Sequence, residues 1–247
     1  MAQNIYDDEG FFAGYATLPR SVEGLDGAPE WPTLRAMLPP LAGRRVVDLG
    51  CGYGWFCRWA ASEGAASVLG IDLSARMLEK ATAHTDDARI TYRRADLDQL
   101  ALDGDVFDVA YSSLTVHYLV HLDALLTQVH RSLVPGGHFV FSAEHPVYTA
   151  PSAPQFVTGD VGGTVRRVWP LDGYLREGPR VTNWFADGVV KQHRTIGTYL
   201  RLLRDAGFTV RDLCEWGPTD EQVAVVPEWS VEQDRPMFML VHAVRSD

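Results

Sequence analysis

Val46-Val47-Asp48-Leu49-Gly50-Cys51-Gly52-Tyr53-Gly54-Trp55 is the stretch that decides the fold of this chain. An apolar run ends in an acid, and three glycines then alternate with larger residues before a helical pattern begins. This pattern predicts a strand, a tight turn and the start of a helix. Glycine has no Cβ and tolerates positive φ, so a ligand can approach the backbone of such a turn closely. The N–H groups of the first helical turn would point at that ligand, and we expect the binding site here.

Predicted strands and helices alternate regularly along the sequence around this stretch. Because strands separated by helices at this spacing form βαβ units, the pattern indicates an α/β fold with a doubly wound, mostly parallel sheet. Strands are expected at 45–49, 67–72, 90–94, 107–112, 138–143, 209–215 and 237–244. Helices are expected at 31–38, 55–63, 121–134 and 195–205, and another should begin after the N-cap Ser74 and run to about His84.

Residues 144–194 interrupt the alternation and are rich in proline, glycine and aromatic residues. A long segment without regular structure inside a compact domain is usually functional. The runs 180–185 and 189–193 flank Ala186-Asp187-Gly188 and predict a β-hairpin. We therefore expect a main domain at 43–247 with a cap inserted at about 145–194, after the fifth strand. Residues 1–42 are expected to form an N-terminal lid segment.

Composition narrows the class of protein. The chain has 247 residues, 46% of them hydrophobic, and a net charge of -10 with no run of Lys or Arg longer than a pair. A nucleic-acid partner is therefore not expected, since such proteins usually carry a basic stripe. No apolar run approaches the length of a membrane span, and the first residues lack the pattern of an export signal. The three cysteines have no metal-ligand spacing, so no metal is expected, and their odd number without an export signal indicates the reducing cytoplasm. We expect a monomer or homodimer.

Two classes of cofactor compete for the glycine turn. A dinucleotide site has the pattern G-x-G-x-x-G; here Gly54 comes one position early and Trp55 takes the place of the third glycine. Asp48 is the stronger objection, because a carboxylate at the strand end would repel a pyrophosphate held close to this turn. It suits a ligand of cationic or mixed charge. S-adenosylmethionine is such a ligand, with a sulfonium, an ammonium and one carboxylate.

Five ordered motifs in the sequence resemble those of the class I S-adenosylmethionine-dependent methyltransferases, of the bacterial small-molecule type. They lie at 46–54, 69–74, 94–97, 107–113 and 133–137. The resemblance covers roughly residues 43–145 and, loosely, the end of the chain. It implies a seven-stranded sheet of order 3-2-1-4-5-7-6 and S-adenosylmethionine as cofactor.

The resemblance also implies which residues bind the cofactor. In this family the acid that matches Asp72 accepts both ribose hydroxyls, which a carboxylate can do side by side. The acid that matches Asp96 meets the adenine amine. From the N-terminal segment, Arg20 could bind the cofactor carboxylate in bidentate fashion. The expected cofactor-binding residues are Asp48, Gly50, Cys51, Gly52, Asp72, Leu73, Met77, Asp96, Leu97, Ser112, Tyr15 and Arg20.

Two missing motifs narrow the range of substrates. Amino-methylases of nucleic acids with this fold carry an Asn/Asp-Pro-Pro-aromatic motif after the fourth strand, where this chain has Ser112-Ser113-Leu114-Thr115. Carbon-5 pyrimidine methylases use a Pro-Cys nucleophile, and here no cysteine follows a proline. Together with the acidic charge, this favours a small-molecule substrate.

Catalytic residues are harder to predict, because methyl transfer from a sulfonium needs a general base only where the acceptor must lose a proton. Ligands of open α/β sheets lie beyond the carboxyl ends of the strands. His117 matches a histidine that often follows the fourth strand of small-molecule methyltransferases. His145 and His193 are further candidates, since histidine exchanges protons near neutral pH. For the substrate we expect an apolar box of Tyr148, Trp169, Tyr174 and Trp184. Tyr6, from the N-terminal lid, is expected to contact the substrate as well.

We therefore predict a methyltransferase that acts on nitrogen or oxygen of a small aromatic or heterocyclic metabolite. Two alternatives stay open. One is a nicotinamide-dependent oxidoreductase, which Asp48 and Trp55 disfavour. The other is a protein that binds S-adenosylmethionine without transferring its methyl group.

Overall fold

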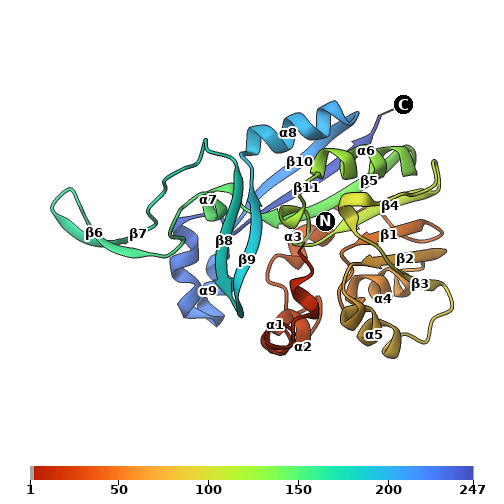
Figure 1. The fold of residues 1–247 in the computed structure, drawn as a ribbon, viewed down its shortest axis with the longest axis horizontal. Coiled ribbons are helices and arrows are strands. Elements are labelled where there is room, and N and C mark those ends of the chain that lie inside the picture. Colours follow the sequence, from red (N-terminus) through yellow and green to blue (C-terminus); the bar gives the residue numbers. More distant parts are fainter. Residues whose placement is uncertain (1–2, 247) are drawn as a thin grey trace.

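A seven-stranded sheet forms the centre of the protein in the computed structural model, which describes residues 3–246 (Figure 1). The strand order is β3-β2-β1-β4-β5-β11-β10, which confirms the predicted 3-2-1-4-5-7-6 topology. The first five strands are parallel, β11 is antiparallel to β5, and β10 is antiparallel to β11. Their bounds are β1 Arg45–Leu49, β2 Ser67–Asp72, β3 Ile90–Arg94, β4 Phe107–Ser112, β5 Leu133–Glu144, β10 Phe208–Trp216 and β11 Phe238–Arg245.

Helices cover both faces of this sheet (Figure 1). One layer contains α3 (Trp31–Ala36), α4 (Trp55–Ser62) and α5 (Ala75–Ala83), and the other contains α6 (Leu122–Ser132) and α8 (Ile196–Asp205). Side chains of a strand alternate between the faces, so Val46 packs with the first layer and Val47 with the second. Both valines are fully buried, as expected for a parallel sheet covered on both sides.

The segment inserted between β5 and α8 folds as a short helix and two hairpins. They are α7 (Pro146–Thr149), β6 (Val157–Val161) with β7 (Thr164–Val168), and β8 (Gly178–Trp184) with β9 (Ala186–His193). The β6–β7 hairpin extends away from the body of the molecule (Figure 1). It was not predicted, although Gly162-Gly163 is a turn signal with positive φ at both residues.

The predicted β8–β9 hairpin is present, but its turn lies elsewhere. Trp184 pairs with Ala186, so Phe185 alone forms the turn, with φ 58°. A register shift between Thr182 and Trp184 incorporates Ala186-Asp187-Gly188 into β9. The start of β5 also differs from the prediction. The turn expected at 135–137 belongs to the strand, as a register shift opposite Phe107 and Val109.

Shorter elements complete the chain. The N-terminal part contains η1 (Ile5–Asp7), α1 (Glu9–Tyr15) and α2 (Pro19–Val22), and η2 (Leu97–Gln99) and η3 (Val116–Tyr118) follow β3 and β4. The expected loop between β10 and β11 contains α9 (Asp220–Val225) and η4 (Pro227–Asp234). Between residues 3 and 246, none of the helices combines the length and apolar character that crossing a membrane requires.

The glycine turn between β1 and α4 is packed on two sides. The N–H groups of Gly50 and Cys51 both donate to the carbonyl of Ile71, at 2.8 and 3.0 Å. Gly50 has φ 80°, and a Cβ built on it would overlap Oγ1 of Thr115, on the loop after β4. Residue 50 must therefore be glycine, both because its φ is positive and because Thr115 occupies the space of a Cβ. The two hydrogen bonds to Ile71 and the contact with Thr115 hold the turn against the ends of β2 and β4.

Replacement of Gly50 by alanine should therefore cost more stability than positive φ alone explains. Gly43→Ala is a matched control, because Gly43 has φ 75° and the described chain places nothing within 4 Å of its added Cβ. We expect Gly43→Ala to lower the free energy of unfolding by about 1 kcal/mol and Gly50→Ala by about 2–4 kcal/mol. Urea denaturation measures both, and equal losses would contradict the proposed overlap with Thr115.

Candidate active site

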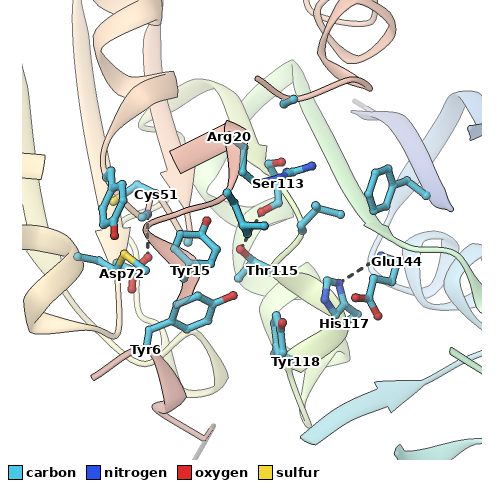
Figure 2. A pocket seen from close by; sticks show the side chains of 18 of the residues that line it. Tyr6, Tyr15, Arg20, Cys51, Asp72, Ser113, Thr115, His117, Tyr118 and Glu144 are labelled. Carbon is cyan, nitrogen blue, oxygen red and sulfur yellow. Dashed lines mark hydrogen bonds between the residues drawn. The ribbon is translucent and has the colours of Figure 1, made fainter. Parts of the chain in front are cut away.

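A cavity of about 530 Å³ lies at the carboxyl ends of β1, β2, β4 and β5. The N-terminal segment, the β8–β9 hairpin and the start of β11 contribute further walls. Figure 2 shows Asp72 and Cys51 at one end, His117 and Glu144 at the other, and Tyr15 and Thr115 between them. Most of the predicted site residues line this cavity. They are Tyr6, Tyr15, Arg20, Asp48, Gly50, Cys51, Gly52, Asp72, Leu73, Met77, Asp96, Leu97, His117, Tyr148 and Trp184.

Asp72, at the end of β2, is held by two backbone groups. Its Oδ2 accepts a hydrogen bond from the Gly52 N–H and its Oδ1 accepts one from the Ser74 N–H, both at 2.9 Å. Burial raises the pKa of Asp72, against the lowering effect of these two N–H groups. The contacts fix the plane of the carboxylate and leave each oxygen able to accept one more hydrogen bond.

Asp96, after β3, has one oxygen in use and one available. Its Oδ1 accepts a hydrogen bond from the Asp98 N–H at 3.0 Å, while within residues 3–246 its buried Oδ2 has no partner. Neighbouring Asp98 differs, since its two oxygens accept from the N–H groups of His121 and Val120 at 2.9 and 3.3 Å. Asp98 therefore serves the fold, whereas Asp96 Oδ2 is left for a donor in the cavity.

Asp48, at the end of β1, is 2% exposed and has no cationic partner in the described chain. Its Oδ2 is 3.4 Å from the Sγ of Cys57, a weak donor. Burial raises the pKa of Asp48 to about 7. A cationic ligand in the cavity would favour the ionised form of this carboxyl group.

Gly52 provides room beside these acids. It has φ 51°, and no described atom lies within 4 Å of a Cβ built on it. A ligand can therefore approach the backbone between Asp48 and Asp72.

The N-terminal segment is attached to both sides of the cavity. On one side, Asp7 Oδ1 accepts hydrogen bonds from Ser74 Oγ at 2.5 Å and from the Arg76 N–H at 3.3 Å. On the other side, the Gln3 side chain pairs with the carbonyl of Gly188 and the N–H of Val190 in β9, both at 2.9 Å. The segment thus bridges α5 and the β8–β9 hairpin across the cavity.

Aromatic side chains fill the contact between the N-terminal segment and the hairpin. The rings of Phe11 and Trp184 meet edge to face at 5.4 Å, and those of Tyr15 and Trp184 at 6.4 Å. Tyr6 in turn meets Tyr15 at 5.3 Å and Tyr118, of η3, at 6.2 Å. These rings give the middle of the cavity an aromatic wall.

Arg20 lines the cavity but already has a protein partner. Its two terminal nitrogens each lie 3.1 Å from one oxygen of Glu30, a carboxylate that is 1% exposed. Burial lowers the pKa of Arg20, but Glu30 outweighs this and the pKa is raised. Any ligand carboxylate would have to share the guanidinium with Glu30.

Three polar side chains meet at the far end of the cavity. Nδ1 of His117 accepts a hydrogen bond from the backbone N–H of Glu144 at 3.3 Å, drawn as a dashed line in Figure 2. Burial lowers the pKa of His117 to about 4. The Nζ of Lys191 lies 2.5 Å from Glu144 Oε1, and both side chains are largely buried.

Lys191 was not among the predicted site residues. A signal existed, because Val189, Lys191 and His193 alternate along β9 and all three are buried. A lysine within a buried face of a strand is uncommon without a partner.

The structure does not bring Ser112, His145 or His193 to the cavity lining, which corrects their predicted roles. Ser112 Oγ donates to the carbonyl of Leu49 at 2.7 Å. The His193 ring lies 2.8 Å from Thr149 Oγ1 and 2.8 Å from the carbonyl of Tyr174, so both nitrogens are occupied. His145 Nδ1 caps α7 by accepting from the Val147 N–H, and its Nε2 lies 3.0 Å from Glu215. Successive residues of an extended chain point to opposite sides, so Glu144 reaches the cavity and His145 does not.

The described residues contain no cluster of three or more His, Cys, Asp or Glu side chains placed to hold a metal ion. The side chains that line the cavity carry carboxylates, one ammonium, one guanidinium, one imidazole, a thiol, hydroxyl and amide groups, and aromatic rings.

Comparisons with known proteins agree with this geometry. A family model described as a methyltransferase domain matches residues 47–141. The crystal structure of an S-adenosylmethionine-dependent methyltransferase from Mesorhizobium loti is 57% identical, with a TM-score of 0.85, and the match covers 90% of this chain and 100% of that one.

Two sequence relatives extend the comparison. An uncharacterized protein of Haemophilus influenzae is 32% identical over 251 residues, which is 97% of this chain and 96% of that protein. A malonyl-[acyl-carrier protein] O-methyltransferase of Erwinia billingiae is 33% identical over 174 residues, which is 68% of this chain and 66% of that enzyme.

The raised pKa of Asp48 makes stability depend on pH in a defined direction. An unfolded chain releases this proton near pH 4, whereas the folded protein holds it until about pH 7. Between these values the free energy of unfolding falls as pH rises, by on the order of 1.4 kcal/mol per pH unit. Asp48→Asn cannot ionise, so its stability relative to the parent should rise by on the order of 2–3 kcal/mol between pH 5 and pH 8.

Asp108→Asn is the control for this measurement by thermal unfolding. Burial raises the pKa of Asp108, but hydrogen bonds from Arg45 outweigh it and the pKa lies below its usual value. Asp108 is therefore ionised at both pH values, and the stability difference of this variant should not change. If the stability difference between Asp48→Asn and the parent also stayed constant from pH 5 to pH 8, the raised pKa of Asp48 would be contradicted.

Proposed function

The chain belongs to the S-adenosylmethionine-dependent methyltransferases, and from that premise we propose that it methylates a nitrogen or oxygen of a small aromatic or heterocyclic molecule. The observation that carries the proposal is the division of one cavity into two ends. Carboxylates of β1–β3 gather at one end, and His117, Glu144 and Lys191 gather at the other, with aromatic rings between them. This arrangement has room for a cofactor and an acceptor side by side.

The carboxylate end has the donors and acceptors that the cofactor requires. The free positions on Asp72 suit the two ribose hydroxyls, and the unpartnered Asp96 Oδ2 suits the adenine amine. Buried Asp48 and the open space at Gly52 suit a cationic methionine end close to the backbone. The cofactor supplies a methyl group already activated as a sulfonium, so the residues of the protein mainly align the reactants and exclude water.

The acceptor end supports a small substrate. The N-terminal segment and the β8–β9 hairpin are joined across the cavity by Gln3 and the aromatic contacts of Phe11 and Tyr15. We therefore assign residues 1–42 as a lid and the inserted segment at about 145–194 as a cap of the methyltransferase domain. A covered cavity with aromatic walls fits a flat molecule better than it fits a macromolecule.

Membership of this family excludes one of the alternative functions that the sequence left open. It does not decide between a free small molecule and a carrier-bound substrate. A nicotinamide-dependent oxidoreductase is incompatible with the methyltransferase family, since the Mesorhizobium loti methyltransferase matches 90% of this chain. The Erwinia billingiae relative acts, by its name, on a malonyl group carried by a protein. Its similarity is weaker and covers about two thirds of each chain, so we retain a free small molecule as substrate.

Cofactor binding is tested most directly at Asp96. Asp96→Asn keeps the Oδ1 atom that caps η2 but replaces the free oxygen by an amide NH₂, which cannot accept from the adenine amine. We expect a loss of about 10- to 100-fold in affinity for S-adenosylhomocysteine by calorimetry, the value of a hydrogen bond to a charged group. Asp86→Asn, at an exposed position outside the cavity, should bind as the parent does. Equal affinities for all three proteins would contradict the role of Asp96.

Activity itself is tested by mass spectrometry. The purified protein, incubated with S-adenosylmethionine and mixtures of small aromatic alcohols and amines, should give a product heavier by one CH₂. The gain must require both the protein and the cofactor. If the protein binds the cofactor but modifies only a carrier-protein thioester, the small-molecule proposal is wrong.

A further inference from the structure

The side chains of Glu144 and His117 lie at the acceptor end of the cavity (Figure 2), and Lys191, which also lines the cavity, is paired with Glu144. Glu144 comes from the end of β5, Lys191 from β9, and His117 from η3 after β4. Figure 2 shows His117 and Glu144 at the opposite end of the cavity from Asp72 and Cys51, and Lys191 is paired with Glu144. The hydrogen-bond donors and acceptors of these three side chains therefore indicate which class of methyl acceptor fits the cavity.

Glu144 is a carboxylate with one oxygen to spare. Its Oε1 is paired with Lys191 Nζ at 2.5 Å, and in the part of the chain that the structure describes its Oε2 is buried without a partner. A buried acceptor without a donor is costly, which points to a ligand group that brings a proton.

His117 and Lys191 are donors. Burial lowers the pKa of His117 to about 4, so the ring is neutral at pH 7. Because Nδ1 accepts from the Glu144 N–H, the single ring proton lies on Nε2 and the ring is not a base in this tautomer. Lys191 adds a positive charge that is 5% exposed.

These groups discriminate among methyl acceptors. A carboxylate acceptor would bring a second negative charge next to Glu144 and has no proton to give. An amine gains positive charge as it is methylated, and Lys191 disfavours this. A hydroxyl group gains negative charge as its proton leaves, and Lys191 and His117 Nε2–H stabilise that charge.

The aromatic residues that line the cavity indicate which class of hydroxyl compound fits. Tyr118, Tyr148, Trp184 and Phe238 also line the cavity, and Phe238 lies opposite Glu144 in the pairing of β11 with β5. Lys191 Nζ lies 5.3 Å from the centre of the Trp184 ring, which holds the ammonium against the wall. Flat aromatic surfaces suit an aromatic ring that carries the hydroxyl.

We propose that the acceptor is a phenolic hydroxyl and that Glu144 is the catalytic base that takes its proton, an inference that rests on the proposed methyl transfer. The O–H proton passes to Glu144 Oε2, and a lone pair of the phenol oxygen forms the new bond to the methyl carbon. The bond between that carbon and sulfur breaks, and its electron pair stays on sulfur. The products are an aryl methyl ether, S-adenosylhomocysteine and a protonated Glu144, which returns its proton to water.

The acceptor class is tested with three probes of similar size: catechol, aniline and benzoate. Each is incubated with the full-length protein and S-adenosylmethionine, and methylated products are measured by mass spectrometry. We expect methylation of catechol and much slower or no methylation of aniline and benzoate. Methylation of aniline or benzoate in preference to catechol would overturn the phenol inference and leave methyl transfer standing.

The role of Glu144 is tested with Glu144→Gln, which keeps the size of the side chain but cannot take a proton at Oε2. We expect kcat/KM for catechol to fall about 10²- to 10⁴-fold, the usual contribution of a general base. For 4-nitrophenol, which ionises in solution at pH 8 without help, the loss should be less than tenfold. A merely structural role would slow both probes equally, and that result would overturn the assignment.

Two controls separate the possible failures. Glu63→Gln, which removes a surface partner of Arg35, should leave both activities unchanged. Calorimetry with S-adenosylhomocysteine shows whether Glu144→Gln is folded, and Glu144→Asp should restore part of the catechol activity. If the parent binds S-adenosylhomocysteine but methylates neither phenol, the phenol inference is wrong. If the parent does not bind it, the proposed function fails first.

Discussion

The contact between the glycine turn and the end of β2 is the constraint on which the site depends. The Ile71 carbonyl accepts from two successive N–H groups of the turn, and the Asp72 carboxylate accepts from a third, that of Gly52. Thr115 packs where a side chain at residue 50 would lie. Backbone hydrogen bonds therefore join the turn after β1 to the end of β2, and the Thr115 side chain packs the loop after β4 against the same turn. This brings Asp48, Asp72 and the loop of His117 to one cavity.

The two ends of this cavity balance charge in different ways. At the cofactor end, burial raises the pKa of Asp48 and of Asp72, and residues 3–246 supply no cation against either carboxylate. These buried carboxylates without a cationic partner lower the stability of the folded protein, and they form a site that favours a cationic ligand. At the acceptor end, Lys191 neutralises Glu144, so the carboxylate can be buried before any ligand arrives. One fold thus keeps two sets of acids in different electrostatic states a short distance apart.

The acceptor end is assembled from segments that are far apart in the sequence. Gln3 pairs with Val190, Phe11 packs on Trp184, and Lys191 reaches Glu144. Each contact is long-range, and each involves the β8–β9 hairpin, which is not part of the main sheet. The hairpin is therefore the element that converts an open edge of the sheet into a covered site.

The sequence alone determined the positions of the main-sheet strands from local signals, and its resemblance to a known family implied their order and the residues expected at the cofactor end. The hydrophobic periodicity, the helix caps and the glycine turn act over a few residues. Asp48 and Asp72 lie at the ends of β1 and β2, and Asp96 lies just after β3, at strands whose positions the sequence predicts. Only the tertiary structure decided the acceptor end. Whether His145 or its neighbour Glu144 faces the cavity depends on which side of the extended chain is covered, and both look equally suitable in the sequence. Lys191 is paired with Glu144, which lies 47 residues away in the sequence. No local sequence pattern can reveal this pair, because it depends on how the β8–β9 hairpin packs against the end of β5.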